Sequence, residues 1–169
     1  MKKAGIKNYE KFAKQVIEAI PDRPVSFEVF ADELSDMSAQ AKVIASWGSN
    51  VNVKIPVTNT KGKFTGPIIR ELSATGVKLN ITAVFTLKQV RSIAENLFLD
   101  TPAIISVFAG RIADTGLDPL PLMRESVEIL NDLPKAELLW ASPRELLNII
   151  QADEVCCHII TATPDILGK

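Results

Sequence analysis

Val51-Asn52-Val53-Lys54-Ile55-Pro56-Val57-Thr58 is a run of β-forming residues that contains a single lysine. Successive side chains of a strand point to opposite faces, so the four hydrophobic residues at the odd positions share one face. The opposite face presents Asn52, Lys54 and Thr58. Proline cannot continue a central strand, so Pro56 marks where the strand ends. The stretch therefore predicts a buried strand with one apolar and one polar face.

Burying Lys54 in this strand costs free energy, because an ammonium group removed from water needs a partner or a cavity. A free lysine has a pKa near ~10.4, so at neutral pH only about one in a thousand is an amine. Desolvation lowers the pKa, and the amine it releases can form a Schiff base with a carbonyl substrate. The alternative is a lysine that extends to solvent or pairs with a carboxylate.

Length and composition indicate one domain, residues 1–169, with a substantial core, since 47% of the residues are hydrophobic. Lys and Arg number 19 and Asp and Glu number 20, which predicts neither a nucleic-acid nor a membrane partner. No apolar run approaches the ~20 residues of a membrane span, and residues 1–3 do not begin a signal peptide. We therefore expect a cytoplasmic protein.

The two cysteines and the only histidine are adjacent, at Cys156, Cys157 and His158. The segment around them is expected to be a strand, in which neighbouring side chains point to opposite faces. We therefore expect two buried thiols rather than a disulfide or a metal site, and a structural histidine. No metal ion and no cofactor is expected.

Strand patterns alternate with helix patterns along the whole chain, and the first four strands begin about twenty-six residues apart. Parallel βα repetition predicts either a barrel or a doubly wound sheet. No phosphate-binding glycine motif follows a strand, which counts against a nucleotide-binding sheet. The polar residues that recur on successive strands instead favour a βα-barrel. The predicted strands cover residues 25–30, 51–58, 77–82, 103–108, 136–141 and 154–161.

Helix-capping residues support this alternation. Asn8 is expected to cap the first helix, Asp32 the second, and Thr86 with Gln89 forms a predicted capping box. Asp118 and Pro119 are expected to open a later helix. Ser142, Pro143, Arg144 and Glu145 predict another helix start.

Five motifs resemble those of the transaldolase family, which consists of Schiff-base-forming βα-barrel enzymes. The resemblance spans essentially the whole chain and implies an (β/α)8 TIM-barrel type of α/β fold. Here it is incomplete, with six parallel strands that match strands three to eight of the family barrel. The motifs are Phe27-Glu28-Val29, Val53-Lys54-Ile55-Pro56-Val57-Thr58, Asn80-Ile81-Thr82-Ala83-Val84-Phe85, the segment from Ser106 to Asp114, and Ala141-Ser142-Pro143-Arg144.

The resemblance implies that Lys54 is the Schiff-base lysine. Glu28 and Thr82 would hold a water that transfers protons. The alternative for Glu28 is a carboxylate that only pairs with Lys54, a role that could coexist with the relay. Asn80 and Ser106 would bind the hydroxyl groups of a ketose. Phe108 takes a position where the related fructose-6-phosphate aldolases tend to have tyrosine, which favours the transferase.

Arg111, Ser142 and Arg144 are implied to form a phosphate site. The free amides and positive dipole end of a helix capped by Ser142 would attract an anion independently of the resemblance. Two guanidinium groups could clamp a sugar phosphate. The alternative for Arg144 is an ordinary surface arginine of a capping box.

The implied activity is that of a transaldolase of the pentose phosphate pathway. It transfers a dihydroxyacetone unit from a ketose phosphate, such as fructose 6-phosphate or sedoheptulose 7-phosphate, to an aldose phosphate. The family's first two strands, with an aspartate and a Thr-Thr-Asn-Pro motif, have no match here, so full activity is not expected from this chain alone. The alternatives are an impaired remnant that binds sugar phosphate, a homo-oligomer that pairs its open strand edges, and a fructose-6-phosphate aldolase-like enzyme.

Overall fold

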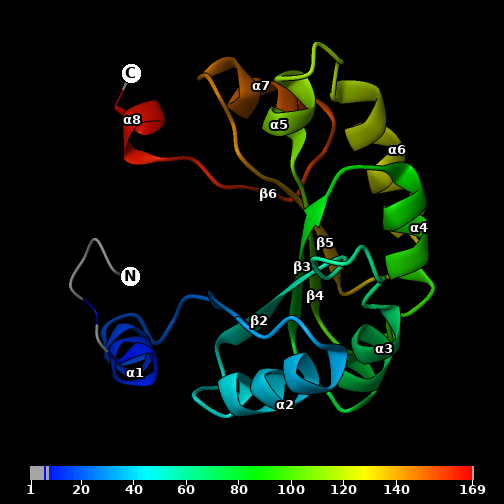
Figure 1. The fold of residues 1–169 in the computed structure, drawn as a ribbon. Coiled ribbons are helices and arrows are strands. Elements are labelled where there is room, and N and C mark those ends of the chain that lie inside the picture. The colour runs from blue at the N-terminus through cyan, green and yellow to red at the C-terminus, as the bar shows by residue number, and fades with distance from the viewer. Residues whose placement is uncertain (1–5, 7, 169) are drawn as a thin grey trace.

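The computed structural model describes residue 6 and residues 8–168. Within them, six parallel strands form one sheet in the order of the chain, β1-β2-β3-β4-β5-β6. The sheet curls into part of a barrel, as expected for incomplete βα-barrel architecture (Figure 1). The strands are β1 (Val25–Glu28), β2 (Val51–Pro56), β3 (Leu79–Val84), β4 (Ala103–Val107), β5 (Ala136–Trp140) and β6 (Ile159–Ile160).

Helices connect every pair of consecutive strands, and α2, α3, α4 and α6 cover the outer side of the curl (Figure 1). α1 and α8 lie at the two ends of the curl in the same view. The helices are α1 (Tyr9–Ala19), α2 (Leu34–Ala45), α3 (Gly66–Ala74), α4 (Leu87–Ala94), α5 (Ala109–Ala113), α6 (Leu120–Leu130), α7 (Leu147–Glu154) and α8 (Pro164–Leu167). Among the described residues, none of these helices has the length and apolar character that a bilayer crossing requires.

The main core lies between the sheet and its outer helices. The odd-numbered residues of β2 are fully or almost fully buried there, as the alternation predicts. Ile69 and Leu72 of α3 and Val90 and Ile93 of α4 supply the facing helix surfaces. The opposite, concave side of the sheet holds only a small apolar cluster of Ile104, Leu139 and Ala141.

A β-bulge interrupts the pairing of β3 with β4 between Ile81 and Val84. Ala83 adopts a left-handed conformation there, with φ of 59°. An unbroken strand would place Thr82 and Val84 on the same face, but Val84 belongs to the main core. The bulge therefore makes Thr82 the last residue of β3 to point to the concave side.

The N-terminal caps are mostly as predicted. The Asn8 side chain accepts a hydrogen bond from the Lys11 backbone amide at 2.9 Å, and Thr86 and Gln89 form the expected capping box. At the start of α6, Asp118 accepts from the backbone amide of Leu120, but the capping residue is Pro119, one residue later than predicted. The prediction for Asp32 was wrong, because its carboxylate instead accepts hydrogen bonds from the amide and hydroxyl of Thr60.

The C-terminal part of the chain differs most from prediction. β6 is limited to two residues, and Glu154 ends α7 instead of opening a strand.

Cys156 is exposed, with φ of 57°, so the expectation of two buried thiols was wrong for this residue. Cys157 is half-buried, and burial raises the pKa of its thiol. His158 is structural, since its Nδ1 accepts a hydrogen bond from the backbone amide of Leu138.

The capping box of α4 makes a stability prediction. Replacing Thr86 by Ala removes the acceptor for the Gln89 amide and should lower the free energy of unfolding by about 1 kcal/mol. Thr86→Ser keeps the acceptor oxygen and should retain most of that free energy. Urea unfolding followed by circular dichroism measures both values. Equal stability of the Ala and Ser variants would show that the cap contributes nothing.

Candidate active site

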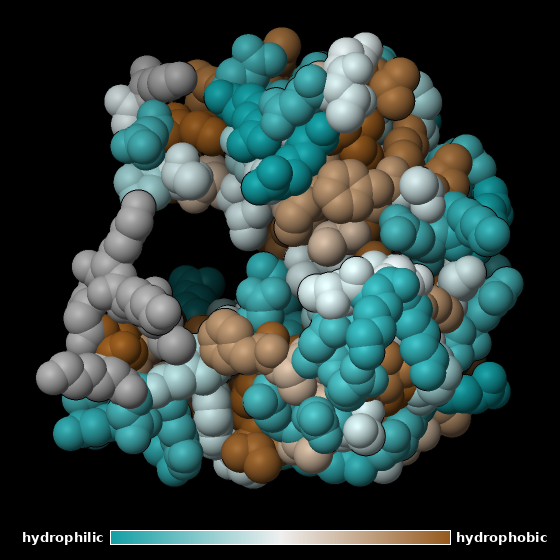
Figure 2. Space-filling view, in the orientation of Figure 1, coloured by the Kyte–Doolittle hydropathy of each residue, from teal (hydrophilic) through white to brown (hydrophobic). Residues whose placement is uncertain are grey.

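A hollow of about 510 Å³ opens on the concave side of the sheet. It lies between the ends of the curl, where the space-filling view shows the molecule hollowed between the regions of α1 and α8 (Figure 2). Its walls combine apolar residues of β4, β5 and β6 with polar residues of β2 and β3. Six of the predicted site residues line it: Lys54, Asn80, Thr82, Ser106, Phe108 and Ser142.

Parallel pairing in register places the central polar residues side by side. Glu28 of β1 pairs with Lys54 of β2, and Lys54 pairs with Asn80 of β3. Thr82 lies two residues further along β3, toward the carboxyl ends of the strands. The strand alternation noted in the sequence therefore becomes a compact set of functional groups on one face.

Lys54 is half-buried in the wall of this hollow and does not extend from the outer side of the sheet. The structure shows no ion pair between the Lys54 ammonium and the carboxylate of Glu28, although their strands are paired at these residues. Glu28 is exposed at the edge of the sheet. Its backbone amide and carbonyl are both hydrogen-bonded to the Tyr9 hydroxyl, at 2.9 and 3.3 Å.

Asn80 and Ser106 are buried polar residues on neighbouring strands, exposed by 5% and 2%. The Ser106 hydroxyl donates to Asn80 Oδ1 at 2.7 Å. Asn80 Nδ2 in turn donates to the hydroxyl oxygen of Ser26 at 3.0 Å. A buried amide with both ends hydrogen-bonded has a defined orientation, so the Asn80 side chain is held in place before any ligand arrives.

Thr82 is exposed by only 3%, and its hydroxyl has no hydrogen-bond partner in the protein. A buried hydroxyl without a partner costs about 1–3 kcal/mol, so such groups usually bind water or a ligand. Thr82 faces the hollow that also contains Lys54. The hydroxyl oxygen is itself closed off from solvent, so Thr82 would have to rotate its side chain to bind a water or a substrate oxygen near the lysine.

Arg144 and Arg111 lie near the rim, outside the residues that line the hollow, and both are exposed. The Arg144 guanidinium makes two hydrogen bonds to the carboxylate of Asp114, one of them from Nε to Oδ1 at 3.0 Å. This pairing lowers the pKa of Asp114 and raises that of Arg144. The Arg111 guanidinium lies 5.9 Å from the ring centre of Phe108, within the range of a cation–π contact.

Ser142 does not cap a helix, contrary to the sequence prediction. α7 begins only at Leu147, and the side chain of Asn148 accepts hydrogen bonds from the amides of Arg144 and Glu145. Ser142 adopts a left-handed conformation with φ of 58°. The predicted anion site at a Ser142-capped helix terminus is thus replaced by a turn, in which Ser142 faces the hollow.

Gly110 of α5 packs directly on this turn. A Cβ atom at Gly110 would lie 1.6 Å from the carbonyl oxygen of Ser142, and the Gly110 amide donates to the carbonyl of Ala141 at 3.3 Å. Only glycine allows this approach. The contact fixes the position of α5, with Arg111, relative to Ser142.

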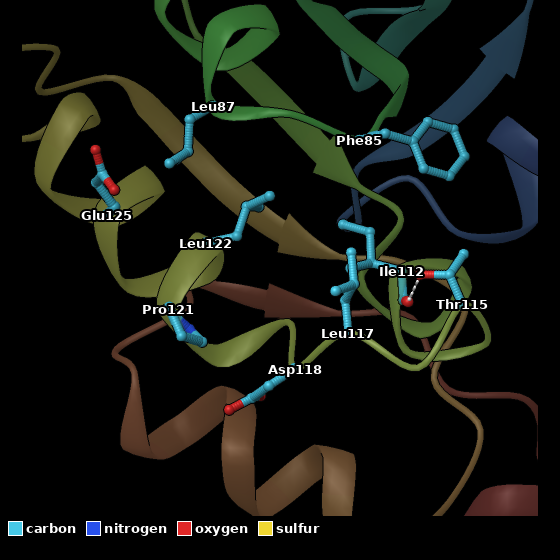
Figure 3. A pocket seen from close by; sticks show the side chains of 9 residues that line it. All are labelled: Phe85, Leu87, Ile112, Thr115, Leu117, Asp118, Pro121, Leu122 and Glu125. Carbon is cyan, nitrogen blue, oxygen red and sulfur yellow. Dashed lines mark hydrogen bonds between the residues drawn. The ribbon is translucent and has the colours of Figure 1, made fainter.

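A second hollow, of about 480 Å³, lies between the start of α4 and the α5–α6 region (Figure 3). Leucine, isoleucine, proline and phenylalanine side chains make most of its wall. Its polar groups are largely engaged, since the Thr115 hydroxyl donates to the Ile112 carbonyl and Asp118 accepts from the Leu120 amide. It contains none of the predicted site residues, so the hollow around Lys54 is the better candidate for chemistry.

Three further polar residues line the candidate site, although the sequence did not assign them to it: Ser26, Asn52 and Thr161. Alternation alone points to the first two, because Ser26 shares a strand face with Glu28 and Asn52 shares one with Lys54. Thr161 lies just beyond the two-residue strand β6, where no alternation is long enough to read.

The curled, parallel βα sheet, with a polar hollow on its concave side, places the chain in the βα-barrel fold class. A family model described as transaldolase/fructose-6-phosphate aldolase matches residues 4–169. The chain belongs to this family.

Relatives of known sequence agree with this membership. The chain is 33% identical over 162 residues to a probable transaldolase 2 of Listeria monocytogenes, covering 95% of this chain and 70% of the relative. It is 34% identical over 166 residues to a probable transaldolase of Dehalococcoides mccartyi, covering 98% of this chain and 73% of the relative. A probable transaldolase of Nitrosopumilus maritimus is 30% identical over 165 residues, covering 96% and 71%.

A solved structure supports the fold alone. A mandelate oxidase mutant superposes with a TM-score of 0.62 at 14% identity. The match covers 92% of this chain and 51% of that structure, so this chain spans about half of its length.

The contact between Gly110 and Ser142 makes a second stability prediction. Gly110→Ala forces a methyl group onto a backbone oxygen and should cost about 3 kcal/mol of unfolding free energy in urea titrations. Gly168→Ala is the matched control, because its added Cβ would lie 3.4 Å from the nearest atom, an ordinary contact. A cost for Gly110→Ala no larger than that of the control would contradict the close packing.

The ion pair between Arg144 and Asp114 makes a prediction about pH. Arg144→Gln should raise the pKa of Asp114 toward its usual value near ~3.9, as measured by carboxyl NMR titration. The pKa of Asp114 is lower in the folded than in the unfolded protein, so its carboxylate stabilises the fold at a pH above the unfolded pKa. This contribution is lost as the pH falls through the folded-state pKa. The stability difference between wild type and variant should therefore shrink below about pH 4.

Arg124→Gln is the control for this titration, because Arg124 belongs to the groove between α4 and α6 and does not contact Asp114. It should leave the pKa of Asp114 low. An equal pKa for Asp114 in the wild type and in Arg144→Gln would show that the pair does not form in solution.

Proposed function

We propose that this chain carries the chemistry of a transaldolase, with Lys54 as the nucleophile that forms a Schiff base with a ketose phosphate. The observation that supports it best is the position of Lys54 in the wall of the polar hollow, in register with Asn80 and close along the sheet to Thr82. Family membership and relatives named probable transaldolase support the same reaction class.

In the proposed reaction, the Lys54 amine attacks the ketone carbon of the donor, and loss of water leaves a protonated imine. The imine accepts the electron pair of the breaking carbon–carbon bond, while a base removes the proton of the adjacent hydroxyl. An aldose phosphate leaves, and the three-carbon enamine stays on Lys54. Attack on the aldehyde of a second aldose phosphate and hydrolysis of the imine complete the transfer. The imine is the electron sink, so the proposed steps call for no metal or cofactor.

The other residues of the site fit supporting roles. The orphan hydroxyl of Thr82 would hold the water that moves protons, with the carboxylate of Glu28 on the neighbouring edge strand as the base. Asn80 and Ser106 would bind substrate hydroxyl groups.

The phosphate would lie near the rim, between Arg111 and Arg144, beside Ser142. Arg144 would need only its remaining N–H groups for this, since two of its donors are engaged by Asp114. The Asp114 carboxylate in turn fixes the plane of the guanidinium, which favours one binding geometry for an anion.

A fructose-6-phosphate aldolase is the second candidate, because the matching family model covers both activities. Phe108 favours the transferase. Its ring packs edge-to-face on Phe85, with centroids 5.5 Å apart, and under the Arg111 guanidinium. A phenylalanine has no hydroxyl group, so Phe108 cannot donate a proton within the hollow to assist the reaction of a free three-carbon ketone.

Reductive trapping tests the proposal. Borohydride added with fructose 6-phosphate should leave a reduced three-carbon adduct on Lys54, located by peptide mass spectrometry. Lys54→Met should abolish the adduct. Lys63→Met should leave it unchanged, because Lys63 is an exposed lysine outside the lining of the hollow. The absence of an adduct under conditions that label one of the relatives would refute the proposed nucleophile.

A further inference from the structure

We propose that Ser26 is a positioning residue of the site, which holds the amide of Asn80 so that one N–H and one lone pair face the hollow. The inference rests on the proposed function and names a residue that the five motifs do not contain. Ser26 lies on β1, lines the hollow, and accepts a hydrogen bond from Asn80 Nδ2 at 3.0 Å.

The bond between Ser26 and Asn80 crosses an intervening strand. Ser26 pairs with Asn52 of β2, whereas Asn80 pairs with Lys54 of the same strand. The side-chain bond therefore passes over β2 between Asn52 and Lys54. It therefore lies on the amino-terminal side of Lys54, within the wall of the hollow.

Ser106 completes the arrangement from the other side. Its hydroxyl donates to Asn80 Oδ1 at 2.7 Å, so three side chains from β1, β3 and β4 form one continuous chain of hydrogen bonds. Asn80 and Ser106 are buried, whereas Ser26 is exposed on the edge strand. Ser26 is thus the end of the chain that a substitution can remove without opening a cavity in the core.

The direction of these bonds leaves defined donors and acceptors. An asparagine amide has two N–H donors and an oxygen with two lone pairs, and each end of Asn80 uses one. Ser26 accepts through its oxygen, so its own hydrogen remains free. Ser106 donates its hydrogen, so its oxygen remains an acceptor. The unused groups suit a ligand with neighbouring hydroxyl groups, each of which both donates and accepts, as in a dihydroxyacetone unit.

Two measurements on the full chain test the inference, with Ser26→Ala, Ser26→Thr and the control Ser46→Ala. The Ser46 hydroxyl donates to the carbonyl of Val43 at the C-terminal cap of α2, and Ser46 does not line the hollow. The first measurement is hydrogen exchange of the Asn80 side-chain amide by nitrogen-15 NMR, without ligand. The second is the rate of borohydride trapping on Lys54 over a range of fructose 6-phosphate concentrations.

Ser26→Ala should speed exchange of the Asn80 amide about tenfold and lower the saturating trapping rate about tenfold, as expected for the loss of one ordinary hydrogen bond. Ser26→Thr keeps the hydroxyl and should restore both within about twofold. Ser46→Ala should change neither. Loss of a hydroxyl that served only the fold would lower the urea midpoint without this selective effect on the saturating rate.

The two readouts separate the two proposals. Trapping in the wild type at the same rate as in Ser26→Ala overturns the role of Ser26 and leaves the proposed function intact. If the wild type traps no sugar, the proposed function fails. Exchange of the Asn80 amide then alone tests whether Ser26 positions Asn80. Faster exchange in Ser26→Ala then supports the positioning of Asn80, and unchanged exchange overturns it.

Discussion

In-register parallel pairing of β1, β2 and β3 is the constraint on which the site depends. Because side chains alternate along each strand, the register Glu28–Lys54–Asn80 puts three polar groups on one face and leaves the apolar residues of the same strands for the core. A slip of one residue in β2 would turn Lys54 into the main core and Ile55 into the hollow. The hydrophobic face of the sheet and the position of the lysine are therefore set by the same interaction.

Two irregular backbone segments then determine where the polar face ends and where the rim residues lie. The bulge at Ala83 ends the polar face of β3 at Thr82, and the left-handed turn at Ser142 lets Gly110 pack against its carbonyl. These contacts place the rim residues relative to the strands, since Arg111 lies in the short helix α5 and Arg144 in the connection between β5 and α7. Exposed charges usually contribute little to stability, and the pairing of Arg144 with Asp114 is better understood as orientation of a guanidinium.

Local patterns predicted the first five strands, several of the caps and the polar face, because each depends on residues close together in the chain. The Thr86–Gln89 capping box and the odd-numbered core residues of β2 are examples. Long-range contacts decided part of the rest. Asp32 is engaged by Thr60, which lies 28 residues away in the chain, so Asp32 does not act as a cap. The failure at Ser142 is local, because Asn148 accepts hydrogen bonds from the amides of Arg144 and Glu145 and α7 begins only at Leu147. The sequence did not predict Ser26 as a site residue, because its role depends on a hydrogen bond to Asn80, two strands away in the sheet.

The central claim is that the Lys54 amine meets a sugar carbonyl inside the hollow. A crystal structure of the chain soaked with fructose 6-phosphate tests it most directly. The account predicts continuous electron density from Lys54 Nζ into a sugar carbon, with the adjoining hydroxyl groups on Asn80 and Ser106. A Lys54 side chain that leaves the hollow, or a sugar bound elsewhere with the lysine unmodified, would contradict it.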